Sequence, residues 1–179
     1  MNYPKVAIRY AKSLMELAES KGAVDAAMAD MSLIVNTIKA NQELVMLLSS
    51  PVVDTAKKEK VLMAIFGDKI SDISKDFVQL ITRKGREGDL LAIADRFIAL
   101  VKERRNIHQA IVTSASPLTA AAKTELLGMV QKIKPGEVEL TEKIDPSIIG
   151  GFILRVDDSM IDASVLARFR KLRQDFSVN

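Results

Sequence analysis

Apolar residues over the first 105 positions recur every three or four residues, which is the spacing of one face of an α-helix. The clearest run is Val24, Met28, Met31, Val35 and Ile38. Glycines and Pro51 interrupt the pattern, because glycine ends helices easily and proline forces the preceding residue out of the helical conformation. The breaks predict six helices, at residues 3–22, 24–38, 41–48, 54–67, 71–84 and 87–105. Their expected caps are Asn41, Asp54 and Ser71, with Gly67 at a helix C-terminus.

The periodicity changes after residue 105. Residues 109–115 and 137–141 alternate as strands do, and a helix is expected between them after Thr119. A hairpin and a last helix complete a small α/β unit. The sequence therefore predicts a mainly α protein, with an N-terminal six-helix bundle at residues 1–105 and an α/β domain at residues 106–179.

The sequence of the hairpin and the last helix predicts a strand face, a turn and a helix cap. Phe152, Leu154 and Val156 fall on one face of a strand, and residues 157–159 read as its turn. Asp162 or Ser164 can cap the helix that follows. We expect one stripe of that helix to pack on the sheet: Val165, Phe169, Leu172 and Phe176.

Composition and charge narrow the class of protein. The chain is 48% hydrophobic and 27% charged, which suits a globular protein, and its 4% aromatic content predicts an aliphatic core. It has no cysteine, so disulfides and thiolate metal sites are excluded. No segment is long and apolar enough to span a membrane, and we expect no signal peptide. The net charge is only +3 and both signs are interspersed, which disfavours nucleic-acid binding.

The sequence offers no constellation for catalysis. The only histidine, His108, has no ligand or catalytic partner at a useful spacing, so a structural or surface role is expected. Gly150 and Gly151 are not followed by the Lys and Ser or Thr of a phosphate loop, and close backbone packing explains them. Asp157 and Asp158 are better explained by a turn than by a metal. We therefore expect no enzyme activity, no cofactor and no metal.

Two segments resemble one known family. They are the opening run from Arg9 to Ala18 and the run from Asp145 through Gly150, Gly151, Asp162 and Ser164. Together they closely resemble the delta subunit of F-type ATP synthase, the bacterial counterpart of the mitochondrial oligomycin-sensitivity-conferring protein. The resemblance covers essentially the whole chain. Asp158 and Ala163 depart from it, since many family members carry glycine there.

The resemblance implies a non-catalytic stator subunit. Its N-terminal bundle would bind the alpha and beta subunits of the catalytic hexamer, and its C-terminal domain the b-type peripheral stalk. The membrane would be reached only through the complex, at the cytoplasmic face of the bacterial inner membrane, without contact to nucleic acid. Ion-driven rotation would thereby be coupled to ATP synthesis.

The resemblance also implies a partner site. The family binds the N-terminal helix of an alpha subunit between its first and fifth helices, and the matching residues here are Tyr10, Ser13, Leu14, Leu80 and Lys84. The alternative for Leu14 and Leu80 is packing within the bundle. Two other functions stay open on sequence alone: an RNA- or ribosome-associated factor, favoured by a pI near 9.1, and a free-standing helical adaptor. The coupling ion and the stalk residues contacted are not encoded in any pattern.

Overall fold

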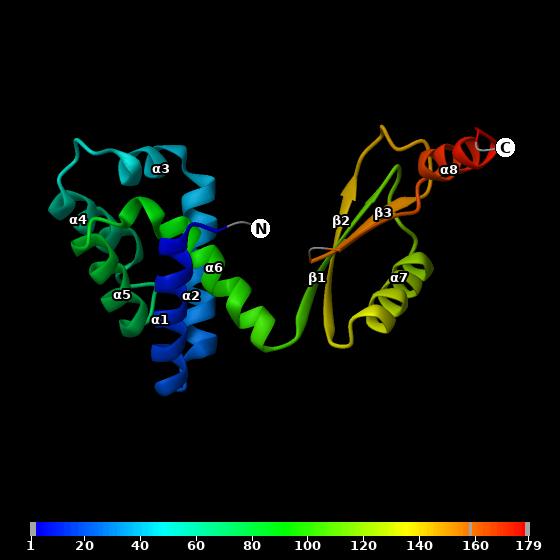
Figure 1. The fold of residues 1–179 in the computed structure, drawn as a ribbon. Helices are drawn as coiled ribbons and strands as arrows, with labels where there is room; N and C mark the ends of the chain where they lie inside the picture. The colour runs from blue at the N-terminus through cyan, green and yellow to red at the C-terminus, as the bar shows by residue number, and fades with distance from the viewer. Residues whose placement is uncertain (1–2, 158, 178–179) are drawn as a thin grey trace. The chain divides into compact units, whose positions relative to one another are not determined.

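The computed structural model describes residues 3–157 and 159–177. For residues 133, 171, 172 and 174–177 it describes the backbone alone. The chain is mainly helical and carries a small four-stranded sheet in its C-terminal part (Figure 1). It divides into two compact units, Met1–Lys102 and Glu103–Asn179. Each unit has its own hydrophobic core, so each is described by itself.

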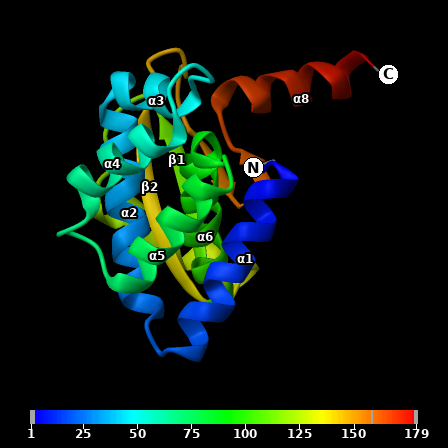
Figure 2. The ribbon, with the colours of Figure 1, turned by 90° about the vertical axis from the view of Figure 1, so that its left-hand side faces the viewer.

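The first unit is built from helices alone. Among its described residues these are α1 (Lys5–Ser20), α2 (Val24–Ala40), α3 (Gln42–Ser49), α4 (Thr55–Phe66), α5 (Asp72–Arg83), the 3₁₀ turn η1 (Glu87–Asp89) and α6 (Leu90–Arg104). Figure 2 shows α1 beside the other helices of this unit. The predicted breaks at Gly22 and Gly85 both adopt positive φ, which glycine allows at little cost.

Alanines make up much of the buried face of α1. Val6, Tyr10, Leu14 and Leu17 recur at helical spacing, and of these only Leu14 is fully buried. The other buried residues of this helix are Ala7, Ala11, Met15 and Ala18. Alanine lets a helix approach its neighbours closely, and Val6, Tyr10 and Leu17 are left on the adjoining, partly exposed face.

The expected N-terminal caps of three helices are absent. The side chains of Asn41, Asp54 and Ser71 precede α3, α4 and α5, and none accepts a capping hydrogen bond. Asn41 donates to the Thr37 carbonyl at 2.8 Å, and the Ser71 hydroxyl donates to the buried Asp30 carboxylate at 2.5 Å. Gly67 lies at the C-terminus of α4, as expected, and has a right-handed conformation. The tertiary contact with Asp30 competes for the Ser71 hydroxyl, and Asn41 bonds back to its own preceding helix, so the local capping preference is not realised at these two residues.

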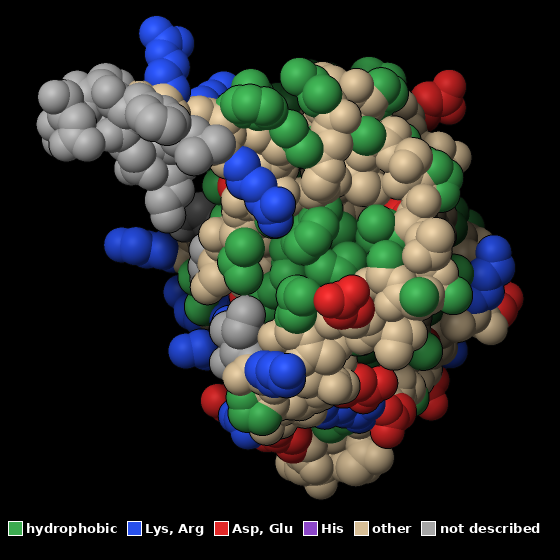
Figure 3. All heavy atoms as spheres, turned by 90° about the vertical axis from the view of Figure 1, so that its right-hand side faces the viewer, with side chains coloured by type: hydrophobic (Ala, Val, Ile, Leu, Met, Phe, Trp, Pro, Cys, Tyr) green, Lys and Arg blue, Asp and Glu red, His purple; other side chains and the backbone are tan. Residues whose placement is uncertain are grey.

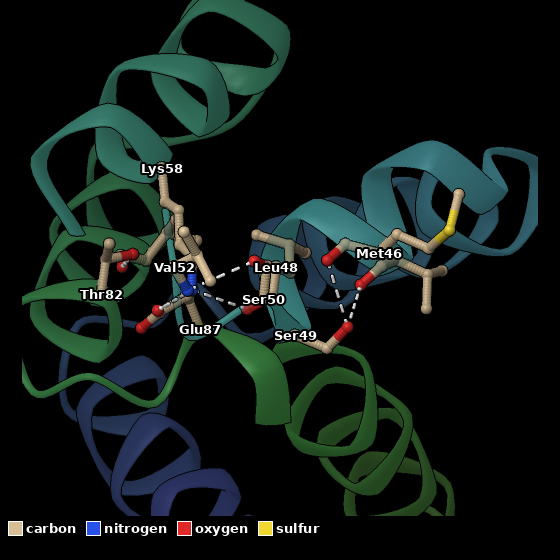
Figure 4. A network of polar contacts seen from close by, with 10 residues as sticks. Met46, Leu48, Ser49, Ser50, Val52, Lys58, Thr82 and Glu87 are labelled. Atoms are coloured by element: carbon tan, nitrogen blue, oxygen red, sulfur yellow. Dashed lines mark hydrogen bonds and ion pairs between the residues drawn. The ribbon is translucent and has the colours of Figure 1, made fainter. Parts of the chain in front are cut away.

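A buried ion pair ties three segments of the first unit together (Figure 4). Lys58 on α4 places its ammonium 2.7 Å from a carboxylate oxygen of Glu87 in η1, and both side chains are more than nine-tenths buried. The same ammonium donates to the carbonyl of Leu48 near the end of α3, at 3.0 Å. It thus satisfies one of the carbonyls that a helix end leaves without an intrahelical partner.

The second unit is an α/β layer. Its strands are β1 (Ile107–Ser114), β2 (Glu137–Ile144), β3 (Phe152–Val156) and β4 (Ser159–Asp162), in the order β2-β1-β3-β4. β1 runs parallel to β2 and antiparallel to β3, and β4 pairs antiparallel with β3. Helix α7 (Ala120–Ile133), capped by Thr119, packs on one face of this sheet. The core contains Ala110, Val112, Leu126, Val130, Leu154 and Val156.

No described side chain of the last helix, α8 (Val165–Ser177), belongs to this core. We expected Phe169 to pack on the sheet, and that prediction was wrong, because 64% of its surface is exposed. Val165 is half-buried, and the side chains of Leu172 and Phe176 lie outside the described part of the chain. An amphipathic helix is predicted equally well whether its apolar face meets its own sheet or another molecule.

Candidate interaction sites

One face of α1 carries a partly exposed apolar stripe. Val6 and Tyr10 are half-buried, and Ser13 and Leu17 are exposed along the same line. These positions repeat every three to four residues beside the buried alanines, so they share one side of the helix. The Arg9 guanidinium lies 5.2 Å from the ring centre of Tyr10, and the Ser13 hydroxyl donates to the Arg9 carbonyl.

Helix α5 presents a matching exposed line. Leu80 is 46% exposed although the helix buries Phe77, Val78 and Ile81 on its other side. Lys84 follows at the exposed C-terminal end, where a cation is favoured by the helix dipole. Figures 1 and 2 both show α5 alongside α1. We call half-buried Tyr10 together with exposed Ser13, Leu17, Leu80 and Lys84 the α1–α5 face.

The structure separates the five predicted partner-binding residues into two groups. Tyr10, Ser13, Leu80 and Lys84 reach the surface on α1 and α5. Leu14 is entirely buried in the helical core, so the packing alternative holds for it. Leu17, which is exposed one turn along from Ser13, was not among the predicted partner-binding residues.

A hollow lies elsewhere in the first unit. It has a volume of about 500 Å³ and is lined by residues of α2, α3 and α4 and of the turn between α2 and α3, namely Thr37, Asn41, Glu43, Leu44, Leu47, Val61 and Ile65. None of its lining residues belongs to α1 or α5. Glu43 is the only titratable residue in this lining, so the hollow offers no set of groups for catalysis.

The family-motif residues of the second unit converge on the start of α8. The Asp162 carboxylate accepts from the amide of Ser164, whose hydroxyl accepts from the amide of Ala167 in the first turn. The amide of Val165 donates to the carbonyl of Gly150 at 2.9 Å. A side chain at Gly151 would collide with the Ala163 carbonyl, so close backbone approach requires glycine there.

Asp145 likewise accepts a hydrogen bond from a nearby backbone amide, just after the end of β2. Its carboxylate accepts from Ser147, and these hydrogen bonds hold the pKa of the Asp145 carboxyl below its ordinary value. The Asp162 pKa is lowered in the same way by Ser164. The five motif residues therefore shape the connection from β2 to β3 and the root of α8.

A polar cluster joins three segments at the other end of the sheet. His108 Nδ1 and Lys134 Nζ lie 3.0 Å and 2.7 Å from the same oxygen of Asp157, which has a positive φ. Burial raises the pKa of the Asp157 carboxyl, but the hydrogen bonds from Lys134, His108 and Gln109 outweigh it and lower the pKa overall. His108 and Asp157 are 49 positions apart, so spacing in the sequence did not indicate this pair. The expectation for Asp158 lies outside the described residues.

The rest of the described chain adds neither a metal site nor a membrane span. No group of three or more His, Asp or Glu among the described residues is placed to hold a metal ion. No described helix combines the length and apolar character needed to cross a bilayer.

Comparison with known proteins gives one consistent result. The family model for the ATP synthase delta (OSCP) subunit matches residues 6–176. "ATP synthase subunit delta" of Cytophaga hutchinsonii is 37% identical over 177 residues, which are 99% of this chain and 97% of that protein. The protein of the same name from Christiangramia forsetii is 35% identical over 179 residues, covering 100% and 97% of the two chains.

A solved structure has the same fold. A chain in the cryo-EM structure of the Toxoplasma gondii mitochondrial ATP synthase hexamer superposes with a TM-score of 0.77, at 19% identity, over 97% of this chain and 98% of that one. With the sequence matches over nearly the full length, this chain belongs to the ATP synthase delta (OSCP) subunit family.

Proposed function

We propose that this chain is a non-catalytic stator subunit of F-type ATP synthase, which joins the catalytic hexamer to the peripheral stalk. The observation that carries the proposal is the family match over residues 6–176. Two units with separate cores agree with it, because each unit can then offer a surface of its own to a different partner. We place the chain at the cytoplasmic face of the membrane, held there through the complex.

The first unit would bind the hexamer through the α1–α5 face. Leu80 and Leu17 expose apolar surface and Tyr10 is half-buried, while Ser13 and Lys84 are exposed polar residues on the same two helices. Apolar anchors with polar edges are what an amphipathic helix needs in order to dock. The N-terminal helix of an alpha subunit is the partner that fits the proposal, with beta subunits adjacent to it.

The second unit would bind the b-type stalk. While the rotor turns, the hexamer must be held against the membrane sector, or the torque would rotate it instead of driving synthesis. Joining two moderate interfaces through one molecule raises the effective concentration at each of them. The chain makes and breaks no covalent bond in this role.

The test compares two substitutions of exposed apolar residues in the full chain. Leu80→Asp should weaken binding of an alpha-subunit N-terminal peptide at least about tenfold, as expected for an interface anchor. Met46→Asp on α3 is the matched control, because Met46 is 57% exposed and lies away from the α1–α5 face. Calorimetric titration measures affinity, and thermal melting of the same samples verifies folding. Equal affinity for wild type and Leu80→Asp, with both folded, would move the site elsewhere.

A further inference from the structure

The two helices of the α1–α5 face each carry one acid and one base on their exposed side. On α5, Asp76 lies one turn before Leu80 and Lys84 lies one turn after it, and both are exposed. On α1, Arg9 and Glu16 are exposed and lie two turns apart on one side of the helix. Along the chain the acid therefore comes first on α5, whereas the base comes first on α1.

α1 and α5 run in opposite directions. α1 and α2 pack together and are joined by the turn at residues 21–23, so α2 begins where α1 ends. Ser71, which precedes α5, bonds to Asp30 in the first half of α2. Just after α5, Glu87 pairs with Lys58, whose ammonium also reaches Leu48 on α3, beyond the end of α2. α5 therefore starts at the end of the bundle where α1 finishes.

Like charges on the two helices consequently lie at the same end of the α1–α5 face. We call the end with Arg9 and Lys84 the basic end, and the end with Glu16 and Asp76 the acidic end. Such segregation is not general on this protein, because Figure 3, which looks from the right-hand side of Figure 1, shows acidic and basic side chains mixed in its lower half.

The four charges that define these ends are not compensated within the molecule. In the part of the chain that the structure describes, none of the four forms an ion pair. Lys5 and Lys12, one turn to either side of Arg9, add to its positive charge. Other charges on or beside the two helices are balanced: Asp72 pairs with Lys75, Arg83 pairs with Glu59, and Glu19 and Lys21 carry opposite charges.

We propose that this arrangement of charge fixes the direction in which an amphipathic helix docks on the α1–α5 face. The bound helix places its acidic residues at the basic end and its basic residues at the acidic end. Apolar contacts alone give little direction, whereas a reversed helix brings like charges together at both ends and loses affinity. The inference rests on the proposed function and adds to it the charge pattern and the direction of the alpha-subunit helix.

The first experiment titrates the full chain with a peptide of the N-terminal helix of the alpha subunit from the same organism. Asp76→Lys combined with Lys84→Asp cancels the charge separation without changing the net charge. It should lower affinity about tenfold at low salt and less at high salt, because exposed charges are screened. The matched control exchanges two exposed charges beside α4, Asp54→Lys with Lys57→Asp, and should bind as wild type does. Thermal melting verifies that both variants fold.

The second experiment measures direction. The chain has no cysteine, so Ser20→Cys carries a single spin label at the acidic end of α1. In the NMR spectrum of the bound peptide, the label should broaden the signals of the peptide's basic end. Adding four exchanges, Arg9→Glu, Glu16→Arg, Asp76→Lys and Lys84→Asp, inverts the charge separation, and the label should then broaden the peptide's acidic end. A loss of stability alone does not reverse a direction.

Each outcome decides one statement. Equal affinity of wild type and the folded Asp76→Lys, Lys84→Asp variant overturns this inference and leaves the stator role intact. Equal broadening of both peptide ends in the wild-type complex also overturns it, whether or not the fourfold variant folds. A similar loss of affinity in the α4 control assigns the effect to general electrostatics and overturns it as well. A wild-type chain that does not bind the peptide overturns both this inference and the proposed contact with the hexamer.

Discussion

At the scale of single residues, the polar groups that matter most here are those buried away from water. Lys58 and Glu87 are 29 positions apart, and nothing in their local sequence marks either as buried. A buried charge is tolerated when its partners are close, and Lys58 has both the Glu87 carboxylate and the Leu48 carbonyl. Removing one partner leaves the other charge uncompensated, which costs far more than removing both.

We therefore expect Lys58→Met to lower the free energy of unfolding by about 3–5 kcal/mol. The double substitution Lys58→Met, Glu87→Leu should recover most of that loss, because no charge is then buried alone. Lys39→Met is the matched control: its pair with Asp95 is exposed, so the change should stay within about 1 kcal/mol. Urea unfolding measures all three variants. A loss at Lys58 no larger than that at Lys39 would mean that the buried pair contributes little.

At the scale of elements, the positions of the helices along the chain were predictable from the sequence, but which side of a helix packs against the rest of the unit was not. The spacing of apolar residues and the breaks at Gly22, Pro51 and Gly85 located α1 to α6 to within a few residues. The buried side of α1 was not predictable, because Ala7 and Ala11 are only weakly hydrophobic and yet permit the closest packing between helices. Four residues of the α1–α5 face came from a family resemblance and Leu17 did not. Periodicity alone did not distinguish exposed Leu80 from buried Leu14.

The second unit should lose stability in acid. The folded-state pKa values of four of its carboxyl groups are lowered. Hydrogen bonds from the Leu118 amide and Lys123 lower the pKa of Glu142, and hydrogen bonds from Ser147 and Ser164 lower those of Asp145 and Asp162. At Asp157, burial raises the pKa, but the hydrogen-bond partners outweigh it. A lowered pKa adds stability above the unfolded-state value near 4, and that stability is lost as pH falls through the folded-state value. Protection factors from hydrogen exchange in residues 103–179 should therefore fall between about pH 5 and pH 3.

Asp157→Asn is the variant that tests the origin of this acid sensitivity. Its amide keeps the size of the side chain but no longer titrates, so the drop in protection around β1 and β3 should be smaller than in wild type. Its protection at neutral pH should be lower, because the charge paired with Lys134 and His108 is gone. An unchanged acid profile in this variant would assign the effect to the other three carboxyls.

At the scale of the whole molecule, two cores imply two separable tasks. A chain that ends after Asn106 keeps every residue of the first core. We expect it to bind the hexamer while failing to connect it to the membrane sector, because binding at one end does not replace the second interface. In reconstituted vesicles, ATP hydrolysis should continue and ion-driven synthesis should be lost. Normal synthesis with the shortened chain alone would contradict a bridging role.

The connection between the two cores is very short. Helix α6 continues to Arg104 and β1 begins at Ile107, so only Arg105 and Asn106 lie between them. Asn106 has a positive φ, and its carbonyl accepts from the amide of Glu137. Any tension that passes from one core to the other along the chain crosses a link with very few free torsions. Because two residues span little length, the link itself can extend only slightly before a pull on one core reaches the other.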